Sequence, residues 1–350
     1  MNVLTVIGNR PQFVKAAAVS RLLREHATET LVHTGQHHDD ELSTVFVEEL
    51  GVPRPEVELG IHGGSNTSQT ARMLEALEPL MAERAPDVVL VYGDTNTTLA
   101  AGLAAAQARV PVAHVEAGMR SFDRAMPEEL NRVLVDHAAD LLLCPSETSV
   151  ANLRAERAAG KVEVVGDVMV DVALAMQPRA REREVAAPDP PYLVATAHRA
   201  GNVDDPERLR RLVDLLTGMP FPVVLPLHPR TRARLEDAGL LARVEAELDV
   251  RPPLGYLDFT ALLLRARAVL TDSGGVQKEA YLGGVQCVTL RDTTEWVETL
   301  NTGWNVLVDL DADAARQALD TPPPEERPLL YGDGHAGDRV VEALTRRYGG

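Results

Sequence analysis

The sequence predicts an α/β protein with two doubly wound parallel sheets that face each other across a cleft. Short apolar runs alternate with segments whose apolar residues recur at helical spacing, which is the pattern of parallel strands joined by helices. The alternation breaks at residues 177–191, which are rich in Pro, Arg, Glu and Ala and read as a linker or an exposed helix end, and then restarts. A length of 350 residues is enough for two cores. We therefore expect domains at residues 1–175 and 176–335, with a C-terminal helix at 336–350 packing back on the first domain.

Composition and charge narrow the classes of function. The formal net charge of −17 argues against nucleic-acid binding, which depends on neutralising phosphates with basic residues. No apolar run is long enough to cross a bilayer, and Met1 leads directly into a strand, so we expect a cytoplasmic protein with no membrane partner. Cys144 and Cys287 each lie within an apolar run, which predicts buried free thiols rather than a disulfide or a metal site.

The first half of the chain opens with a strand followed by a helix with cations at its start. Pro11 suits the first turn of that helix, which we expect over residues 12–25. Arg10 and Lys15 oppose the helix dipole there, which is unfavourable unless an anion docks between them. The alternative is that both are ordinary surface cations. The expected strands of this half are 3–8, 30–34, 87–92, 110–115, 140–144 and 162–166.

Two carboxylates come directly after strands of this half, and a third lies at the start of the helix that follows the second of these strands. Asp94 comes after strand 87–92, Glu116 after strand 110–115, and Glu128 opens the next helix. In doubly wound sheets ligands bind beyond the carboxyl ends of the strands, so these three side chains are candidates for chemistry. The alternative for Asp94 is a simple helix cap.

In the second half, histidines end two of the expected strands. His198 follows strand 192–196, and His228 follows strand 221–227 together with Arg230. A single histidine is more often a satisfied core or surface side chain, but two at strand ends of one domain favour a functional role for His198. The other strands expected in this half are 268–271, 287–290 and 305–308.

The stretch VLTDSGGVQKEAYLGG, residues 269–284, hands a buried strand over to a helix. Gly274 and Gly275 let the backbone approach a ligand, and the free N–H groups of the helix start favour phosphate. Glu279 lies further along the helix, where a carboxylate can accept hydrogen bonds from ribose hydroxyls. The alternative is that Ser273 is an N-cap in a tight turn.

These residues together resemble the non-hydrolysing UDP-N-acetylglucosamine 2-epimerase family. The resemblance covers nearly the whole chain, with the strings in matching order and spacing. They are GNRPQFVKAA, HTGQH, VYGDTNTTLA, HVEAGMRS, MPEELNR, GDVMVD, HR, LTDSGGVQKEA and LRDTTEWVE.

The resemblance implies two Rossmann-like domains in the glycosyltransferase-B arrangement, a homodimer, a UDP-sugar substrate, and no nicotinamide or metal cofactor. It implies that UDP is eliminated across C1–C2 to give a glycal and then added back with C2 protonated on the other face. The implied acid–base and sugar-orienting residues are Asp94, Glu116 and Glu128, assisted by His198. The implied UDP- and substrate-binding residues are Arg10, Lys15, His228, Arg230, Phe259, Ser273, Gly274, Gly275 and Glu279.

The expected reaction converts UDP-N-acetylglucosamine to UDP-N-acetylmannosamine for cell-surface polysaccharide precursors. Two alternatives within this architecture are a UDP-sugar-dependent glycosyltransferase and a UDP-sugar sensor. A third concerns only the substrate, because RPQFVKAA, VQKEA and TEWVE resemble the branch acting on UDP-2,3-diacetamido-2,3-dideoxy-glucuronate. That sugar carries a C6 carboxylate and a second acetamido group, for which Arg230 or Arg120 would supply a cation and Trp296 an apolar wall.

Overall fold

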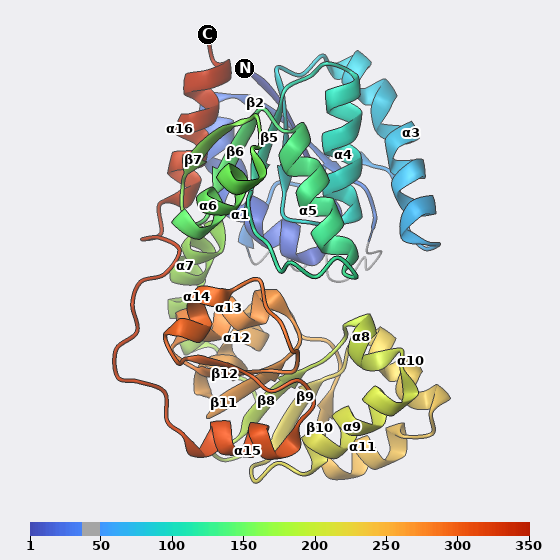
Figure 1. Cartoon of the computed structure of the whole chain (residues 1–350), viewed down its shortest axis with the longest axis vertical. Helices are drawn as coiled ribbons and strands as arrows, with labels where there is room; N and C mark the ends of the chain where they lie inside the picture. Colours follow the sequence, from blue (N-terminus) through green and yellow to red (C-terminus); the bar gives the residue numbers. More distant parts are fainter. Residues whose placement is uncertain (37–49) are drawn as a thin grey trace. The chain divides into compact units, whose positions relative to one another are not determined.

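The computed structural model describes residues 1–36 and 50–350, apart from the side chain of Arg10 (Figure 1). The end of the HTGQH string therefore lies outside the described residues. Contacts divide the chain into unit 1, residues 1–174 and 331–350, and unit 2, residues 175–330. The boundary falls inside helix α7 (Val168–Glu182).

Within its described residues, unit 1 contains a seven-stranded parallel sheet in the order β3-β2-β1-β4-β5-β6-β7. The order 3-2-1-4-5-6 is that of a dinucleotide-binding fold, and its direction reverses between β1 and β4. The central strands are mostly apolar because both faces of the sheet are covered, with Thr5 of β1 and His114 of β5 as buried polar exceptions. The strands are β1 (Asn2–Ile7), β2 (Thr28–His33), β3 (Val57–Glu58), β4 (Val88–Tyr92), β5 (Val112–Val115), β6 (Leu141–Cys144) and β7 (Lys161–Val164).

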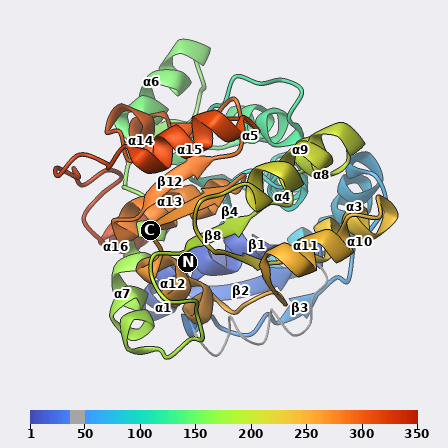
Figure 2. The same cartoon turned by 90° about the horizontal axis from the view of Figure 1, so that it is seen from below.

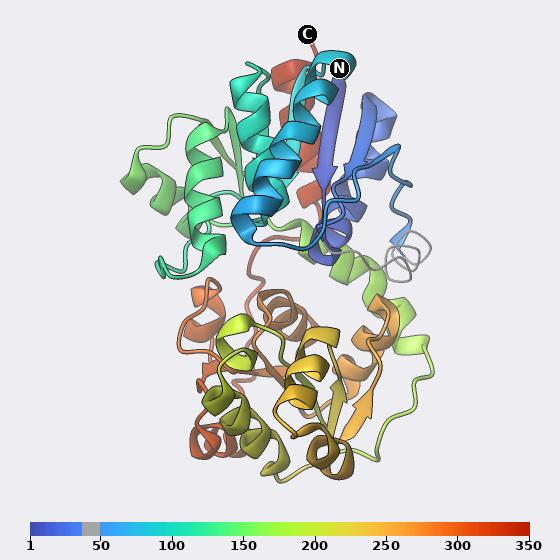
Figure 3. The same cartoon turned by 90° about the vertical axis from the view of Figure 1, so that its right-hand side faces the viewer.

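Helices cover both faces of this sheet. Met73 and Leu77 of α3 pack with Leu4 and Val6 of β1 on one face, which α4 and α5 also cover. Helices α1 and α16 lie together on the other face (Figure 3). The helices of unit 1 are α1 (Arg10–His26), α3 (Asn66–Arg84), α4 (Asn96–Gln107), α5 (Pro127–Ala138), α6 (Glu147–Glu156), the first part of α7, and α16 (Ala336–Tyr348).

The described sheet of unit 2 has six parallel strands in the order β10-β9-β8-β11-β12-β13, the same order as in unit 1, with its reversal between β8 and β11. Helices α9, α10, α11 and α15 pack on one face, and α12 and α13 on the other (Figure 2). The strands are β8 (Leu193–Thr196), β9 (Val223–Pro226), β10 (Asp249–Arg251), β11 (Ala268–Thr271), β12 (Gln286–Thr289) and β13 (Asn305–Leu307). The helices are α8 (Ala200–Val203), α9 (Pro206–Thr217), α10 (Pro229–Asp237), α11 (Leu241–Glu247), α12 (Tyr256–Arg265), α13 (Gly274–Gly283), α14 (Val297–Asn301) and α15 (Ala312–Asp320).

The predicted α/β class with two doubly wound parallel sheets is confirmed, with differences in detail. The short edge strands β3 and β10 were not expected, because neither carries a clear apolar run. Residues 177–182 are the helical end of α7, whereas no regular structure follows until β8, so only the rest of the segment 177–191 is a linker. Both cysteines are free and buried, as predicted. None of the described helices has the length and apolar character needed to span a membrane.

The last helix, α16, approaches α1 closely. A Cβ atom at Gly337 would lie 2.3 Å from the carbonyl oxygen of Ala18 in α1. The carboxylate of Asp171 accepts hydrogen bonds from the N–H groups of Ala336 (3.1 Å) and Gly337 (2.7 Å), which caps the start of α16. The C-terminal helix is therefore a packed part of unit 1.

We predict that Gly337→Ala destabilises the protein by about 1–3 kcal/mol, although alanine is the better helix former. The new methyl group would have to displace the Ala18 backbone. Gly201→Ala in α8 is the matched control, because its Cβ meets no atom within 4 Å, and it should be neutral or stabilising by about 0.4–1 kcal/mol. Urea unfolding of both variants measures the difference, and equal stability would contradict the close packing.

Candidate functional site

The two strand ends at the reversal point of unit 1 are fastened by a buried glutamine. The Gln12 side chain accepts a hydrogen bond from the N–H of Gly8 (2.8 Å) and donates to the carbonyl of Tyr92 (2.8 Å) and to Thr98 Oγ1 (2.9 Å). Gly8 follows β1 and Tyr92 ends β4, so one side chain fixes the loops that follow both strands. This is the edge where doubly wound sheets bind ligands.

Lys15 and Glu116 form a nearly buried ion pair at this edge. The Lys15 ammonium lies 2.5 Å from Glu116 Oε2, and each side chain is 10% exposed. Burial lowers the pKa of Lys15, but the carboxylates of Glu116 and Asp94 outweigh it, so the pKa is raised and the amine stays charged. Glu116 follows β5 with φ +74°, a left-handed conformation that is costly for a side-chain-bearing residue and typical of functional positions.

Asp94 is held beside this pair by an arginine. The Arg132 guanidinium binds Asp94 Oδ2 through Nη2 (2.5 Å) and Nε (3.0 Å), and it also contacts Glu129 Oε2 at 3.1 Å. Burial raises the pKa of Asp94, but Arg132 and Lys15 outweigh burial, and the pKa is lowered. Glu128 lies in the first turn of α5 and is partly buried. The structure thus brings Asp94, Glu116 and Lys15 together in unit 1.

A second network supports the backbone around these carboxylates. His114 of β5 contacts Asp136 Oδ1 through Nδ1 (2.7 Å) and donates from Nε2 to the carbonyl of Gly93 (2.7 Å). Asp136 Oδ2 accepts from the N–H of Gly118 (3.0 Å) and pairs with Arg120 (2.8 Å). The buried Asp136 carboxylate therefore holds two loops near Glu116, the Gly118 loop directly and the Gly93 loop through His114.

In unit 2 a buried aspartate fastens the strand ends at the reversal point. Asp272 follows β11 and accepts hydrogen bonds from the N–H groups of His198 (3.1 Å) and Arg199 (3.0 Å), which follow β8. The His198 Nδ1 atom lies 3.7 Å from Asp272 Oδ1, and its ring stacks on that of His228 at 5.1 Å. The two predicted histidines are thus neighbours.

The SGG turn begins α13. Ser273 is the N-cap, with no side-chain cap hydrogen bond, and its N–H donates to Thr271 Oγ1 (2.9 Å). A Cβ at Gly274 would lie 2.3 Å from Glu295 Oε1, so a side chain there would have to displace the Glu295 carboxylate. At Gly275 a Cβ would meet only Ser273 Oγ, at 3.9 Å, so this part of the backbone is open to a ligand. Glu279 is partly buried further along the helix.

Other predicted residues are engaged by neighbouring groups. Arg230 is ion-paired with Asp204, and the N–H of Arg230 donates to His228 Nδ1 (3.2 Å), so His228 caps α10. Phe259 packs in the apolar core beneath α12 and α13. Trp296 is buried with the Lys278 ammonium 3.9 Å from its ring centre, and it therefore presents no bare apolar wall.

Arg120 was one candidate cation for a sugar carboxylate, and the structure gives it a structural position instead. Its guanidinium is 1% exposed and lies between Asp136 (2.8 Å) and Glu156 (2.7 Å). Two buried or half-buried carboxylates already neutralise it, so it has no free face for a ligand.

Sequence reasoning missed Gln12, Glu129 and Arg132. Each belongs to a string already quoted, but its role depends on a partner distant in the sequence, such as Tyr92 for Gln12 and Asp94 for Arg132. The spacing of Glu129 and Arg132, three apart on one helix, was the available signal.

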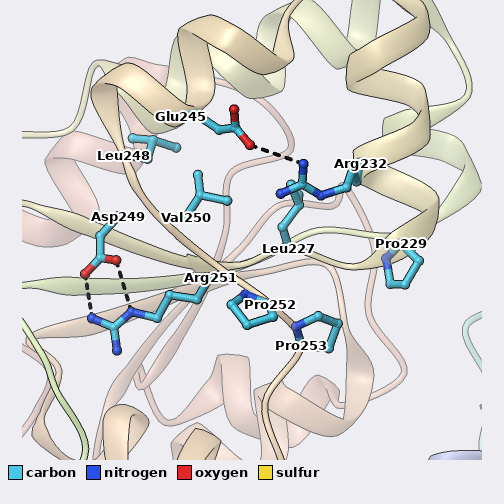
Figure 4. A pocket seen from close by; sticks show the side chains of 10 residues that line it. All are labelled: Leu227, Pro229, Arg232, Glu245, Leu248, Asp249, Val250, Arg251, Pro252 and Pro253. Atoms are coloured by element: carbon cyan, nitrogen blue, oxygen red, sulfur yellow. Dashed lines mark hydrogen bonds and ion pairs between the residues drawn. The ribbon is translucent and has the colours of Figure 1, made fainter. Parts of the chain in front are cut away.

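Unit 2 also has a surface pocket of about 600 Å³ that is lined by none of the predicted residues, although Leu227 and Pro229 on its wall flank His228 (Figure 4). Its charged side chains are paired with each other, Arg232 with Glu245 (3.1 Å) and Arg251 with Asp249 (2.5 Å). No group of three or more His, Cys, Asp or Glu side chains suited to a metal ion occurs in the part of the chain that is described. The pocket lining is Leu227, Pro229, Arg232, Glu245, Leu248, Asp249, Val250, Arg251, Pro252 and Pro253.

Comparison with known proteins gives a consistent picture. A family model described as UDP-N-acetylglucosamine 2-epimerase matches residues 21–345. UDP-2,3-diacetamido-2,3-dideoxy-D-glucuronate 2-epimerase of Pseudomonas aeruginosa is 48% identical over 99% of this chain and 100% of its own. UDP-N-acetylglucosamine 2-epimerase of Methanocaldococcus jannaschii is 38% identical, with 99% of each chain covered. A crystal structure of the M. jannaschii protein with UDP-GlcNAc and UDP covers 99% of this chain and 100% of its own, with a TM-score of 0.93 and 37% identity.

We predict that Asp136→Asn lowers the free energy of unfolding at pH 7 by about 3–5 kcal/mol, because it leaves Arg120 facing a neutral buried partner. Burial raises the pKa of Asp136, but His114 and Arg120 outweigh it and lower the pKa below 3.8. Its stabilisation is therefore present above the unfolded-state pKa and is lost as pH falls through the lower folded-state value.

Urea unfolding at pH 7, 5, 4 and below measures how much larger the free energy of unfolding is for the wild type than for Asp136→Asn. This difference should stay constant from pH 7 downwards and shrink only at the lowest pH values. Glu78→Gln, an exposed carboxylate on α3, serves as the control with no such difference. A difference that instead grows on acidification would contradict the assignment of the charge network.

Proposed function

Because the chain belongs to the UDP-N-acetylglucosamine 2-epimerase family, we propose that it inverts C2 of a UDP-activated 2-acetamido sugar by eliminating and re-adding UDP. The observation that carries this proposal is the cluster of Asp94, Glu116 and Lys15 at the reversal point of a doubly wound sheet. The C2 proton of such a sugar is too weakly acidic for simple removal, so loss of UDP from C1 must accompany it.

Unit 2 is assigned to the nucleotide. The open backbone at Gly275 and the start of α13 suit the diphosphate, whose charge the helix dipole favours. Glu279 is assigned to the ribose hydroxyls, and Ser273 supplies a hydroxyl beside the phosphates. The positions of Arg10, Arg230, His228 and Phe259 in UDP or substrate binding remain proposals from the resemblance.

Unit 1 is assigned to the proton transfers. A carboxylate accepts the C2 proton while the C2–H electron pair forms the C1–C2 double bond and the C1–O bond breaks, releasing UDP. UDP then returns to C1, and a proton from the opposite face reaches C2. The lowered pKa of Asp94 makes it a weak base, which suits orienting the sugar, and leaves Glu116 and Glu128 for the transfers. Lys15 keeps the cluster from accumulating negative charge as UDP departs.

Two substrates are candidates. UDP-N-acetylglucosamine is named for the M. jannaschii relative and for its crystal complex. UDP-2,3-diacetamido-2,3-dideoxy-D-glucuronate is favoured by the 48% identity to the P. aeruginosa protein, against 38% for the M. jannaschii protein. The reaction is the same for both sugars.

We predict that the protein, given a UDP-sugar alone in deuterated water, incorporates deuterium at C2. A glycosyltransferase or a sensor would leave C2 unlabelled. Glu116→Gln and Glu128→Gln should each slow incorporation by about 10²–10⁴-fold while calorimetry shows UDP binding nearly unchanged. Glu147→Gln, an exposed glutamate in the first turn of α6, is the matched control and should behave as wild type. No labelling by the wild type with either candidate sugar would refute the proposed reaction.

We further propose a homodimer, supported by the reversed amphipathicity of α5. Its charged residues Glu129, Arg132 and Asp136 are buried, whereas Leu130 and Leu134 are 57% and 46% exposed. Because the inner face serves the carboxylate cluster, the outer face is apolar, and an apolar helix face is normally covered. A second copy would offer the same face in a two-fold arrangement.

Leu134→Arg should convert the dimer to a monomer in sedimentation velocity, because the arginine would be buried without a partner. Leu329→Arg in unit 2, at an exposed leucine outside any helix, should leave the dimer intact. A monomeric wild type at all concentrations, or a dimeric Leu134→Arg, would contradict this assignment.

A cytoplasmic location is also proposed. It is supported by Cys144 and Cys287, which are free thiols with pKa values raised to about 12 by burial. Free thiols are usual in a reducing compartment.

A further inference from the structure

The loop between β5 and α5 (Figure 1) carries an exposed aromatic residue and an exposed arginine. Phe122 is 74% exposed and has φ +59°, so its backbone adopts a conformation that is unfavourable for an aromatic residue. Arg124 is exposed two residues later, and it makes no ion pair with any carboxylate in the described parts of the chain. The loop therefore places an exposed aromatic ring close in sequence to an arginine that makes no ion pair among the described residues.

This loop is fixed rather than loose. The buried carboxylate of Glu129 accepts hydrogen bonds from Ser121 N–H (2.8 Å), Ser121 Oγ (2.9 Å) and Phe122 N–H (3.1 Å). Asp123 Oδ1 accepts from Ala125 N–H (2.9 Å) and closes the turn that carries Arg124. Three hydrogen bonds to the Glu129 carboxylate thus stabilise the strained backbone at Phe122. They fix the backbone positions from which the Phe122 and Arg124 side chains extend.

The same carboxylate connects the loop to the proposed catalytic cluster. Glu129 Oε2 lies 3.1 Å from Arg132 Nη1, and Arg132 in turn binds Asp94. Two side chains therefore link the Phe122 backbone to a carboxylate assigned to the sugar. The loop also follows β5 directly after Glu116, so it leaves the same edge of the sheet as the cluster. Chain connectivity and this hydrogen-bond relay therefore join the loop to the carboxylate cluster within unit 1.

The two cations that the sequence suggested for binding a sugar carboxylate already form ion pairs within the protein. Arg120 is buried between Asp136 and Glu156, and Arg230 is paired with Asp204. Arg124 is the exposed cation that follows Glu116 on the same loop and keeps its guanidinium unoccupied among the described residues. A carboxylate ligand could form a bidentate, charge-assisted ion pair with Arg124 without breaking an existing ion pair.

We propose that Arg124 and Phe122 select a sugar with a C6 carboxylate and a second acetamido group, so that the preferred substrate is a UDP-2,3-diacetamido-uronate. The Arg124 guanidinium pairs with the carboxylate, and the Phe122 ring packs against the acetamido methyl group. This inference rests on the proposed function, because it names the substrate of the same reaction. A neutral 2-acetamido sugar reaches the same carboxylate cluster but leaves Arg124 without a ligand charge.

The test compares kcat/KM for UDP-2,3-diacetamido-2,3-dideoxy-D-glucuronate and UDP-N-acetylglucosamine, with deuterium incorporation at C2 as the readout. The wild type should favour the uronate by at least about tenfold, or ~1.4 kcal/mol. Arg124→Gln should remove most of that preference by lowering kcat/KM for the uronate much more than for the neutral sugar. Arg124→Lys should restore part of it, because the charge returns without the planar fork. Arg154→Gln, at an exposed arginine of α6, is the matched control and should keep the wild-type ratio.

The outcomes separate the two proposals. If the wild type labels neither sugar, the proposed reaction itself fails. If it labels one or both but Arg124→Gln keeps the wild-type ratio, the reaction stands and the role of Arg124 is refuted. A wild type that favours the neutral sugar likewise overturns the inference. Phe122→Ala should weaken the uronate preference while sedimentation stays that of the wild type; if the preference is intact and only the sedimentation changes, the ring belongs to an interface between copies instead.

Discussion

The ion pair of Lys15 and Glu116 is the interaction on which the rest of the site depends. Two opposite charges are held almost without water, so their attraction is strong, but each would be costly without the other. The backbone is arranged for this contact. Glu116 adopts a positive φ at the end of β5, and Gly93 has no Cβ where one would lie 2.9 Å from the ammonium. A charged amine is thereby placed beside Asp94 as well.

The two units use different side chains to hold the loops at the point where the strand order reverses. In each sheet the strand order reverses at one point, and such a reversal is where doubly wound sheets bind ligands. The two loops that leave the sheet there have no strand between them, so side chains must hold them in place. Gln12 fastens the loops of unit 1 by accepting from Gly8 and donating to Tyr92. Asp272 fastens those of unit 2 by accepting from the N–H groups that follow β8. A neutral amide suits an edge crowded with carboxylates, and an anion suits one with exposed histidine and arginine.

The sequence predicted what depends on local chemistry and missed what depends on distant partners. Apolar runs and strand-end polar residues located β4 and β5, and hence Asp94 and Glu116, because burial and turn formation act over a few residues. Arg120 was misjudged as a candidate ligand because its partner Glu156 lies 36 residues away. Arg124 was overlooked because the sequence does not show which arginines form ion pairs. It stands out as a candidate only once the partners of Arg120 and Arg230 are known. Glu129 rather than Glu128 anchors the loop, a choice set by which helix face is buried.

We expect C2 inversion to proceed through cleavage of the C1–O bond at the unit 1 carboxylates. This route is tested most directly with a UDP-sugar carrying ¹⁸O in the bridge between C1 and the β-phosphorus. Free rotation of released UDP within the enzyme would move the label into non-bridging positions of the β-phosphate. The wild type should scramble the label during turnover, and Glu116→Gln should slow scrambling and epimerisation together. Inversion at C2 with all of the ¹⁸O still in the bridge would contradict this route.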